Sequence, residues 1–113
     1  MQWAPEGKCG MWAQLIRTRL KDGSEEGLQQ LVQQLRDAEQ PGSGLLRTLV
    51  MREQQDPNAL SMLVLFESEE KARLRENDPR RAEGLAAARA TMAKIFDGPP
   101  SFTDLTVVEE YTP

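Results

Sequence analysis

Histidine is absent from this sequence of 113 residues, and cysteine occurs only once, at Cys9. A zinc site of the usual Cys/His type needs several such ligands, so the sequence excludes one. The Ser-His-Asp and Cys-His arrangements of nucleophilic catalysis both require histidine and are excluded as well. A single cysteine cannot form an internal disulfide, so we expect a cytoplasmic protein. Cys9 is expected to have no role, and the alternative is a redox or intermolecular role.

Phosphate-cradling glycine loops and long apolar runs are missing too. The glycines stand at predicted turns and helix ends instead of forming a G-x-G-x-x-G run, so we expect no flavin or other cofactor. Apolar runs such as residues 62–66 are far shorter than the roughly 20 residues that span a bilayer, so no membrane partner is expected. The net charge is −4 and the arginines are scattered, which argues against a nucleic-acid partner.

A chain of this length is expected to form one domain. Its first ten residues show no hydrophobic periodicity and no apolar segment typical of a signal peptide. We therefore predict a disordered or loosely docked tail over residues 1–10, followed by a single folded domain over residues 11–113.

Hydrophobic periodicity predicts strands and helices from residue 11 onward. Residues 11–20 alternate as a strand does, whereas Leu28, Leu31 and Leu35 form the apolar stripe of a helix. In chain order the predicted elements are a strand over 11–20, a helix from Ser24 to before Pro41, a hairpin of strands over 45–53 and 59–67, a helical segment over 68–97 that restarts at Asp78–Pro79, and a strand over 102–111. This order is that of the ferredoxin-like βαββαβ fold, an α+β architecture in which helices cover one face of a four-stranded antiparallel sheet.

Two of the predicted strands, over 11–20 and 59–67, are apolar on both sides. They would therefore present apolar side chains on the face that the helices leave uncovered. Large exposed apolar patches mark interfaces, and a symmetric pair of copies is the commonest way to cover them. We therefore expect a homodimer.

Four segments carry a resemblance to a known family. They are MWAQLIRTRLKDG at residues 11–23, PGSGLLRTLVMRE at 41–53, LSMLVLFESEEKAR at 60–73 and VVEEY at 107–111. Over residues 11–111 the chain resembles the antibiotic biosynthesis monooxygenase-like family of the dimeric α/β-barrel superfamily. The resemblance implies a barrel formed by two sheets across a homodimer, with a small-molecule pocket between the sheet and the helices of each subunit.

Members of that family differ in their chemistry. Some oxidise aromatic polyketides without a cofactor, and others degrade haem with an Asn, a Trp and a His at positions that match Ile16, Arg75 and Leu85 here. None of these residue types is kept, so haem degradation is not expected. We interpret the chain as a homodimeric domain with a pocket for a small aromatic molecule and no recognisable catalytic constellation. The alternatives are a cofactor-independent monooxygenase acting on an aromatic or phenolic substrate, and a structural or partner-binding module.

Three residues are candidates for that pocket. Trp12 and Gln14 share the side of the first strand that is expected to line it, where Trp12 could stack on an aromatic ligand and Gln14 could orient the ligand. Arg75, in the predicted helical segment, could close the pocket mouth on an acidic ligand. Each also has a structural interpretation, with Trp12 in the core, Gln14 bonded to the backbone and Arg75 on a solvated helix face.

Overall fold

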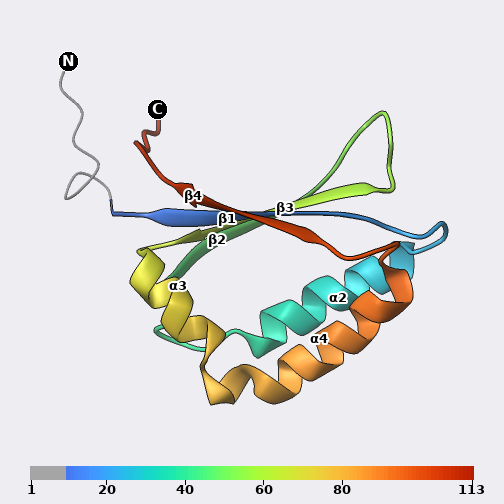
Figure 1. Cartoon of the computed structure of the whole chain (residues 1–113), viewed down its shortest axis with the longest axis horizontal. Helices are drawn as coiled ribbons and strands as arrows, with labels where there is room; N and C mark the ends of the chain where they lie inside the picture. The colour runs from blue at the N-terminus through green and yellow to red at the C-terminus, as the bar shows by residue number, and fades with distance from the viewer. Residues whose placement is uncertain (1–9) are drawn as a thin grey trace.

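The computed structural model describes residues 10–113, so the predicted tail over residues 1–10, including Cys9, lies outside the described residues except for Gly10. The chain forms, in order, β1 (Trp12–Arg19), α2 (Glu25–Ala38), β2 (Leu45–Arg52), β3 (Ala59–Phe66), α3 (Glu69–Glu76), the short 3-10 helix η1 (Pro79–Arg81), α4 (Ala82–Ile95) and β4 (Ser101–Thr106) (Figure 1). This order confirms the predicted ferredoxin-like fold. No helix within the described residues is long and apolar enough to cross a membrane.

The four strands form one antiparallel sheet in the order β2-β3-β1-β4. Helices α2, α3 and α4 lie on one side of this sheet, with α2 and α4 packed together and α3 running from the sheet toward them (Figure 1). On the covered face Trp12 pairs with Phe66, and Gln14 pairs with Val64. Side chains alternate between the two faces of a strand, so Trp12 and Gln14, which are two residues apart, both point toward the helices.

Two glycines allow α2 and α4 to pack closely. A Cβ atom on Gly84 would lie 2.7 Å from the Cβ of Ala38, and one on Gly27 would lie 2.5 Å from Cγ2 of Ile95. Both distances are far shorter than the roughly 3.5–4.0 Å of a normal carbon contact, so the spacing of the helices depends on glycine. Leu31, in the predicted apolar stripe, is fully buried between these helices and the sheet.

Strand β4 ends at Thr106, earlier than the predicted end at Tyr111. Its neighbour β1 begins at Trp12, which pairs with Thr106, so β1 offers no further strand residue for pairing. The last backbone contact is a hydrogen bond from the N–H of Val107 to the carbonyl of Met11 (3.2 Å). The predicted last strand is therefore wrong in its second half, because its partner strand ends there.

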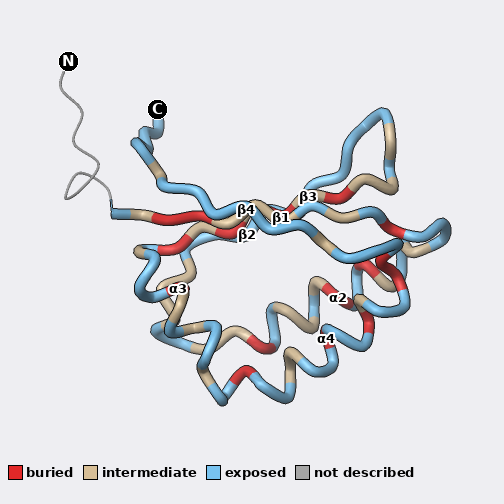
Figure 2. The backbone as a smooth tube through the Cα atoms, viewed as in Figure 1, coloured by how far each residue is buried: buried red, intermediate tan, exposed pale blue. Residues whose placement is uncertain are grey.

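Burial alternates along β3, residue by residue (Figure 2). The buried set, which includes Leu60 and Phe66, faces the helices, whereas the half-buried Leu63 and Leu65 face the opposite side. Leu49 on β2 pairs with Leu63 and is 41% exposed on that opposite side, which we call the open face. The structure thus confirms that both sides of the sheet carry apolar residues, and no helix of the described residues covers the open face.

Candidate functional site

Two separate apolar clusters lie between the sheet and the helices. One fills the space under α2 and α4. The other lies where α3 meets the sheet, and we call it the aromatic cluster; it consists of Trp12, Val64, Phe66 and Ala72, with Ile16 and Leu45 packed against it. It contains one predicted site residue and lies on the helix-facing side, where the sequence predicts a pocket.

Trp12 is buried in the aromatic cluster, with 6% of its surface exposed. Its ring centroid is 5.9 Å from that of Phe66, and the two rings are tilted by 42°. The guanidinium of Arg73, on α3, lies 4.8 Å from the indole centroid. A cation in this position is attracted by the electron-rich ring face. Arg73 therefore covers the indole and was not identified by the sequence analysis.

Gln14 lies on the helix-facing side of β1, as Trp12 does. Its side chain forms a hydrogen bond with the edge strand β4. Its amide donates a hydrogen bond to Oδ1 of Asp104 (3.0 Å), and Arg73 donates one to Oδ2 of the same carboxylate (2.9 Å). The hydrogen bond from Gln14, followed by that from Arg73, holds the pKa of Asp104 below its usual value. The partner of Gln14 is thus a carboxylate and not the backbone.

Arg75 reaches the aromatic cluster from α3. Its guanidinium lies 5.1 Å from the ring centroid of Phe66. Its Nε and Nη2 donate to both carboxylate oxygens of Glu39, over distances of 2.6 to 3.1 Å. The side chains of Arg75 and Glu39 are 16% and 21% exposed, so this bidentate pair is largely shielded from water. This position does not fit the interpretation of Arg75 as a solvated helix residue.

The environment of Glu39 keeps it ionised. Burial raises the pKa of this carboxyl, but hydrogen bonds from Arg75 and Ser43, together with the charge of Arg75, outweigh burial and lower the pKa below its usual value. A carboxylate with a lowered pKa is a weak base at neutral pH. Glu39 and Asp104 are therefore suited to holding arginines in place, and less suited to accepting a proton from a substrate.

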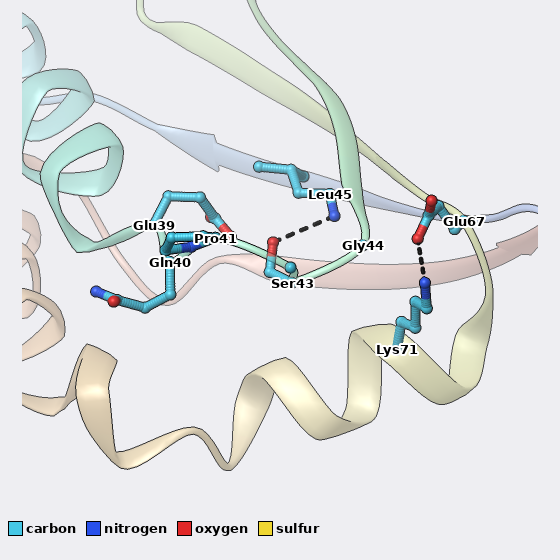
Figure 3. A pocket seen from close by; sticks show the side chains of 9 residues that line it. Glu39, Gln40, Pro41, Ser43, Gly44, Leu45, Glu67 and Lys71 are labelled. Atoms are coloured by element: carbon cyan, nitrogen blue, oxygen red, sulfur yellow. Dashed lines mark hydrogen bonds and ion pairs between the residues drawn. The ribbon is translucent and has the colours of Figure 1, made fainter.

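A hollow of about 490 Å³ opens beside the Glu39–Arg75 pair. Figure 3 shows that it lies between the loop that follows α2 and the start of α3. The residues that line it are Glu39, Gln40, Pro41, Gly42, Ser43, Gly44, Leu45, Glu67 and Lys71. Leu45 belongs to this lining and also packs against the aromatic cluster, so the hollow adjoins the cluster.

Gly44 lines the hollow in a conformation that strongly favours glycine. Its φ is +84°, a conformation that L-residues rarely adopt. A Cβ at this position would also lie 2.7 Å from the side chain of Lys71. The run of Pro41, Gly42, Ser43 and Gly44 was the only sequence signal for this loop, and it indicated a helix end, not a binding site.

Arg81, in η1, is a buried arginine that the sequence pattern did not indicate. It is 5% exposed, and its Nη1 donates to the backbone carbonyl of Arg75 (3.2 Å). Burial, followed by the nearby charge of Arg75, lowers the pKa of Arg81. Among residues 10–113 no carboxylate lies within ion-pair distance of it. The same part of the chain contains no group of three or more carboxylate, histidine or cysteine side chains placed to hold a metal.

The structure brings two of the three predicted site residues together. Trp12 and Arg75 both contact Phe66, one from β1 and the other from α3. Gln14 lies on the same face but is bonded to Asp104 at the sheet edge. The site also contains arginines and carboxylates that sequence reasoning missed, because each acts through a partner distant in the chain.

Comparison of the sequence with protein-family models finds no match, and comparison with curated proteins finds none either. Solved structures do share its fold. A candidate antibiotic biosynthesis monooxygenase from Chloroflexus aurantiacus is 18% identical, with a TM-score of 0.64 over 90% of this chain and 97% of its own. SnoaB from Streptomyces nogalater, a cofactor-independent oxygenase studied as a mutant, is 15% identical, with a TM-score of 0.68 over 89% and 96% of the two chains. A protein of unknown function from Nitrosomonas europaea is 19% identical, with a TM-score of 0.70 over 95% and 98%.

At these identities the likeness establishes the fold and no more. The chain has the fold of antibiotic biosynthesis monooxygenase-like proteins, which confirms the family resemblance of its sequence at the level of structure. What those proteins bind or oxidise is a property of those proteins, and for this chain it remains a matter of proposal.

Proposed function

We propose that this protein binds a small aromatic molecule between its sheet and its helices, as one subunit of a homodimer, without converting it. The ligand would enter through the hollow beside the Glu39–Arg75 pair, where Glu39 lines the polar side and Leu45, which packs against the aromatic cluster, lines the apolar side. The volume of about 490 Å³ is within the range of roughly 300–1,000 Å³ typical of small-molecule sites.

The observation that carries the proposal is the meeting of Trp12 and Arg75 at Phe66. The indole lies 5.9 Å and the guanidinium 5.1 Å from the same ring. Aromatic rings and the planar guanidinium all stack favourably on a flat aromatic ligand. We assign Trp12 and Arg75 to contact with the aromatic ring of the ligand. Gln14, whose side chain is held by its hydrogen bond to Asp104, is assigned to orienting the ligand.

Binding without turnover is supported by the acid-base properties of the site. The pKa of Glu39 and the pKa of Asp104 are both lowered, so neither carboxylate is matched to proton abstraction near neutral pH. Both are also engaged by arginines, which would have to release them before they could act on a substrate.

The homodimer is supported by the apolar side chains of the open face. Leu49, Met51 and Leu105 are exposed there, and Leu63 and Leu65 are half-buried. Each Å² of apolar surface removed from water stabilises an assembly by about 25 cal/mol, so a second copy packed on this face would gain from it. A cytoplasmic location is retained as a prediction from the sequence.

A cofactor-independent monooxygenase is the second candidate. It is favoured by the fold shared with SnoaB over 96% of that chain. In this alternative Arg75 would stabilise the anion of a phenolic substrate, because a fixed cation lowers the energy of a developing negative charge.

Calorimetric titration with 2-naphthol, a planar phenol, tests the proposed site. We expect saturable binding that Arg75→Gln weakens by roughly tenfold or more, since hydrogen bonds involving charged groups contribute about 1.5–3 kcal/mol. Arg36→Gln, an exposed arginine on α2, is the matched control and should bind as the wild type does. In a Trp3→Phe background the only indole N–H signal in an NMR spectrum belongs to Trp12, and 2-naphthol should shift it.

Two results would contradict the proposal. The absence of binding at millimolar 2-naphthol would contradict the proposed pocket for an aromatic molecule. Oxygen consumption that depends on 2-naphthol and on Arg75, recorded with an oxygen electrode, would contradict binding without turnover and support the cofactor-independent monooxygenase.

A further inference from the structure

Residues 107–113, which we call the C-terminal arm, continue beyond the last strand without a partner in their own copy. After the hydrogen bond from Val107 to Met11, the arm makes no further backbone hydrogen bond to any residue from 10 to 113. Tyr111 is 88% exposed. The arm rises from the end of β4 on the side of the sheet opposite the helices (Figure 1). It therefore projects toward the space that a second copy on the open face would occupy.

The side chains of the arm form a pattern that suits an interface. Leu105 of β4 pairs with Ala13, and both face the open side of the sheet. Continued beyond β4, the two-residue repeat of a strand divides the side chains of the arm between two sides. The side of Leu105 receives Val107, Glu109 and Tyr111. An extended arm thus presents one carboxylate between two apolar side chains.

Arg47 carries the complementary charge on the open face. It pairs with Leu65, which faces that side, and it is exposed. Neither Arg47 nor Glu109 forms an ion pair with any residue from 10 to 113. Arg47 lies on β2, an edge strand, so a segment of another copy reaches it without displacing a strand. Opposite charges at an interface orient the two partners, and these two charges have no counterpart in one copy.

The strand register divides the open face into three rows that run across the sheet. The first row, at the end where β4 finishes, and the second row are mostly apolar, whereas the third is mostly polar. Across β2, β3, β1 and β4 the rows are Arg47, Leu65, Ala13 and Leu105, then Leu49, Leu63, Leu15 and Thr103, then Met51, Ser61, Arg17 and Ser101. The arm leaves the sheet at the first row.

A two-fold axis allows two ways to stack such faces with their strands aligned. An axis across the strands would lay the polar third row on the partner's first row and set Arg17 against the partner's Ala13. An axis along the strands lays each row on the same row of the partner, so apolar side chains meet apolar side chains. The second arrangement places β4 of one copy over β2 of the other and brings the arm to the partner's Arg47.

We propose that the two copies of the homodimer exchange their C-terminal arms, with Glu109 of each arm paired with the partner's Arg47. Val107 and Tyr111 pack on either side of this pair against the partner's sheet. This inference rests on the proposed homodimer and specifies which segment holds it together. Because of the two-fold symmetry, each dimer contains the contact twice.

Charge reversal tests the exchange, with the dimer Kd measured by sedimentation equilibrium. Arg47→Glu sets two carboxylates against each other in both contacts, and Glu109→Arg sets two guanidinium groups against each other. We expect each variant to raise the Kd roughly tenfold or more, since like charges at an interface repel. An equimolar mixture of the two variants should recover the wild-type Kd, because both contacts of the mixed dimer then join opposite charges.

Glu110→Arg is the matched control. It makes the same change of charge one residue further along the arm, on the side away from Leu105. Its Kd should stay near that of the wild type, and it should not restore dimerisation when mixed with Arg47→Glu. If Arg47→Glu does not fold, as judged by circular dichroism, the comparison of Glu109→Arg with Glu110→Arg decides, and equal effects of the two would overturn the exchange.

The outcomes separate the exchange from the homodimer on which it rests. A wild type that sediments as a monomer would overturn both. A wild-type dimer that Leu49→Glu dissociates, but whose Kd is unchanged in Arg47→Glu and Glu109→Arg, would keep the homodimer and overturn the exchange. Recovery in the double variant Arg47→Glu/Glu109→Arg without recovery in the mixture would place the contact within one chain and would also overturn the exchange.

Discussion

The guanidinium of Arg73 lies 4.8 Å from the ring centroid of Trp12 and also donates to Asp104. These three residues come from α3, β1 and β4, so one arginine connects the short helix to the sheet and to its edge strand. Arg73 additionally binds Glu69 and Glu76 within its own helix. The cover over Trp12 is therefore an exposed, charged network on top of a buried apolar ring.

Removal of this cover should make Trp12 accessible. In a Trp3→Phe background we expect Arg73→Gln to shift the Trp12 emission to longer wavelength and to increase its quenching by acrylamide, because water gains contact with the indole. Arg80→Gln, which leaves the cover intact, should change neither property. Unchanged emission in Arg73→Gln would show that the aromatic cluster buries Trp12 without help from the arginine.

Truncation of the indole itself should destabilise the fold. We expect Trp12→Ala to lower the free energy of unfolding by about 3–5 kcal/mol, the cost of a large cavity in a packed cluster. Urea denaturation followed by circular dichroism measures this change. A loss below about 1 kcal/mol would mean that the ring is poorly packed, and Trp12→Phe should recover much of the loss because a phenyl ring refills part of the space.

The order of strands and helices could be predicted from the sequence because it depends on local periodicity. Leu28, Leu31 and Leu35 lie on one side of any helix that contains them, and the two-residue repeat places Trp12 and Gln14 on one side of any strand. The end of β4 could not be predicted in this way. It depends on where β1 begins, and β1 is a separate segment of the chain.

The polar part of the site depends on contacts between distant segments. Arg75 and Glu39 are separated by 36 positions in the sequence, and no spacing rule connects the residue that follows one helix with the last turn of another. Arg81 is buried because η1 packs beside α3, and no local sequence pattern predicts that packing. Trp12 and Arg75 were chosen as candidates because the family resemblance assigns the pocket to the side of their elements, and their contact with a ligand stays a prediction.

The ion pair of Glu39 and Arg75 should make stability depend on pH in the acid range. The pKa of Glu39 is lowered in the folded protein relative to an unfolded glutamate, whose pKa is about 4.3. Its contribution to stability is therefore fully present above that value and is lost as the pH falls through the lower folded pKa.

Urea denaturation of the wild type and of Glu39→Gln over a range of pH measures this effect. At pH 7 we expect Glu39→Gln to be less stable by about 1–3 kcal/mol, and we expect the difference to shrink once Glu39 is protonated in the wild type. Glu70→Gln, an exposed glutamate on α3, is the control and should not reproduce this dependence. A constant difference between wild type and Glu39→Gln at all pH values would contradict the assignment.

The contact between α2 and α4 should not tolerate a methyl group at Gly84. Alanine normally stabilises a helix by roughly 1 kcal/mol relative to glycine. At Gly84 the added Cβ would lie 3.1 Å from the Cα of Ala38, which is backbone and cannot turn away. We expect Gly84→Ala to lower the free energy of unfolding by about 1–3 kcal/mol, the typical cost of overpacking. A stabilised Gly84→Ala variant in thermal denaturation would show that the helices separate easily.

A charge placed on the open face should separate the proposed homodimer. Leu49 lies on that face and is 41% exposed in the single chain, so a second copy would bury it. Two glutamates brought together by the symmetry of a dimer would be desolvated without a partner, which costs several kcal/mol. We therefore expect the wild type to sediment at twice the chain mass of 12.7 kDa at micromolar concentration, and Leu49→Glu at the chain mass itself.

The matched control for Leu49→Glu is Leu74→Glu. Leu74 is 66% exposed on α3, on the helical side of the molecule, so the same substitution there adds the same charge away from the open face. Leu74→Glu should remain dimeric, and both variants should keep the circular dichroism spectrum of the wild type. A wild type that sediments as a monomer would contradict the homodimer, and dissociation of Leu74→Glu in place of Leu49→Glu would move the interface from the open face to α3.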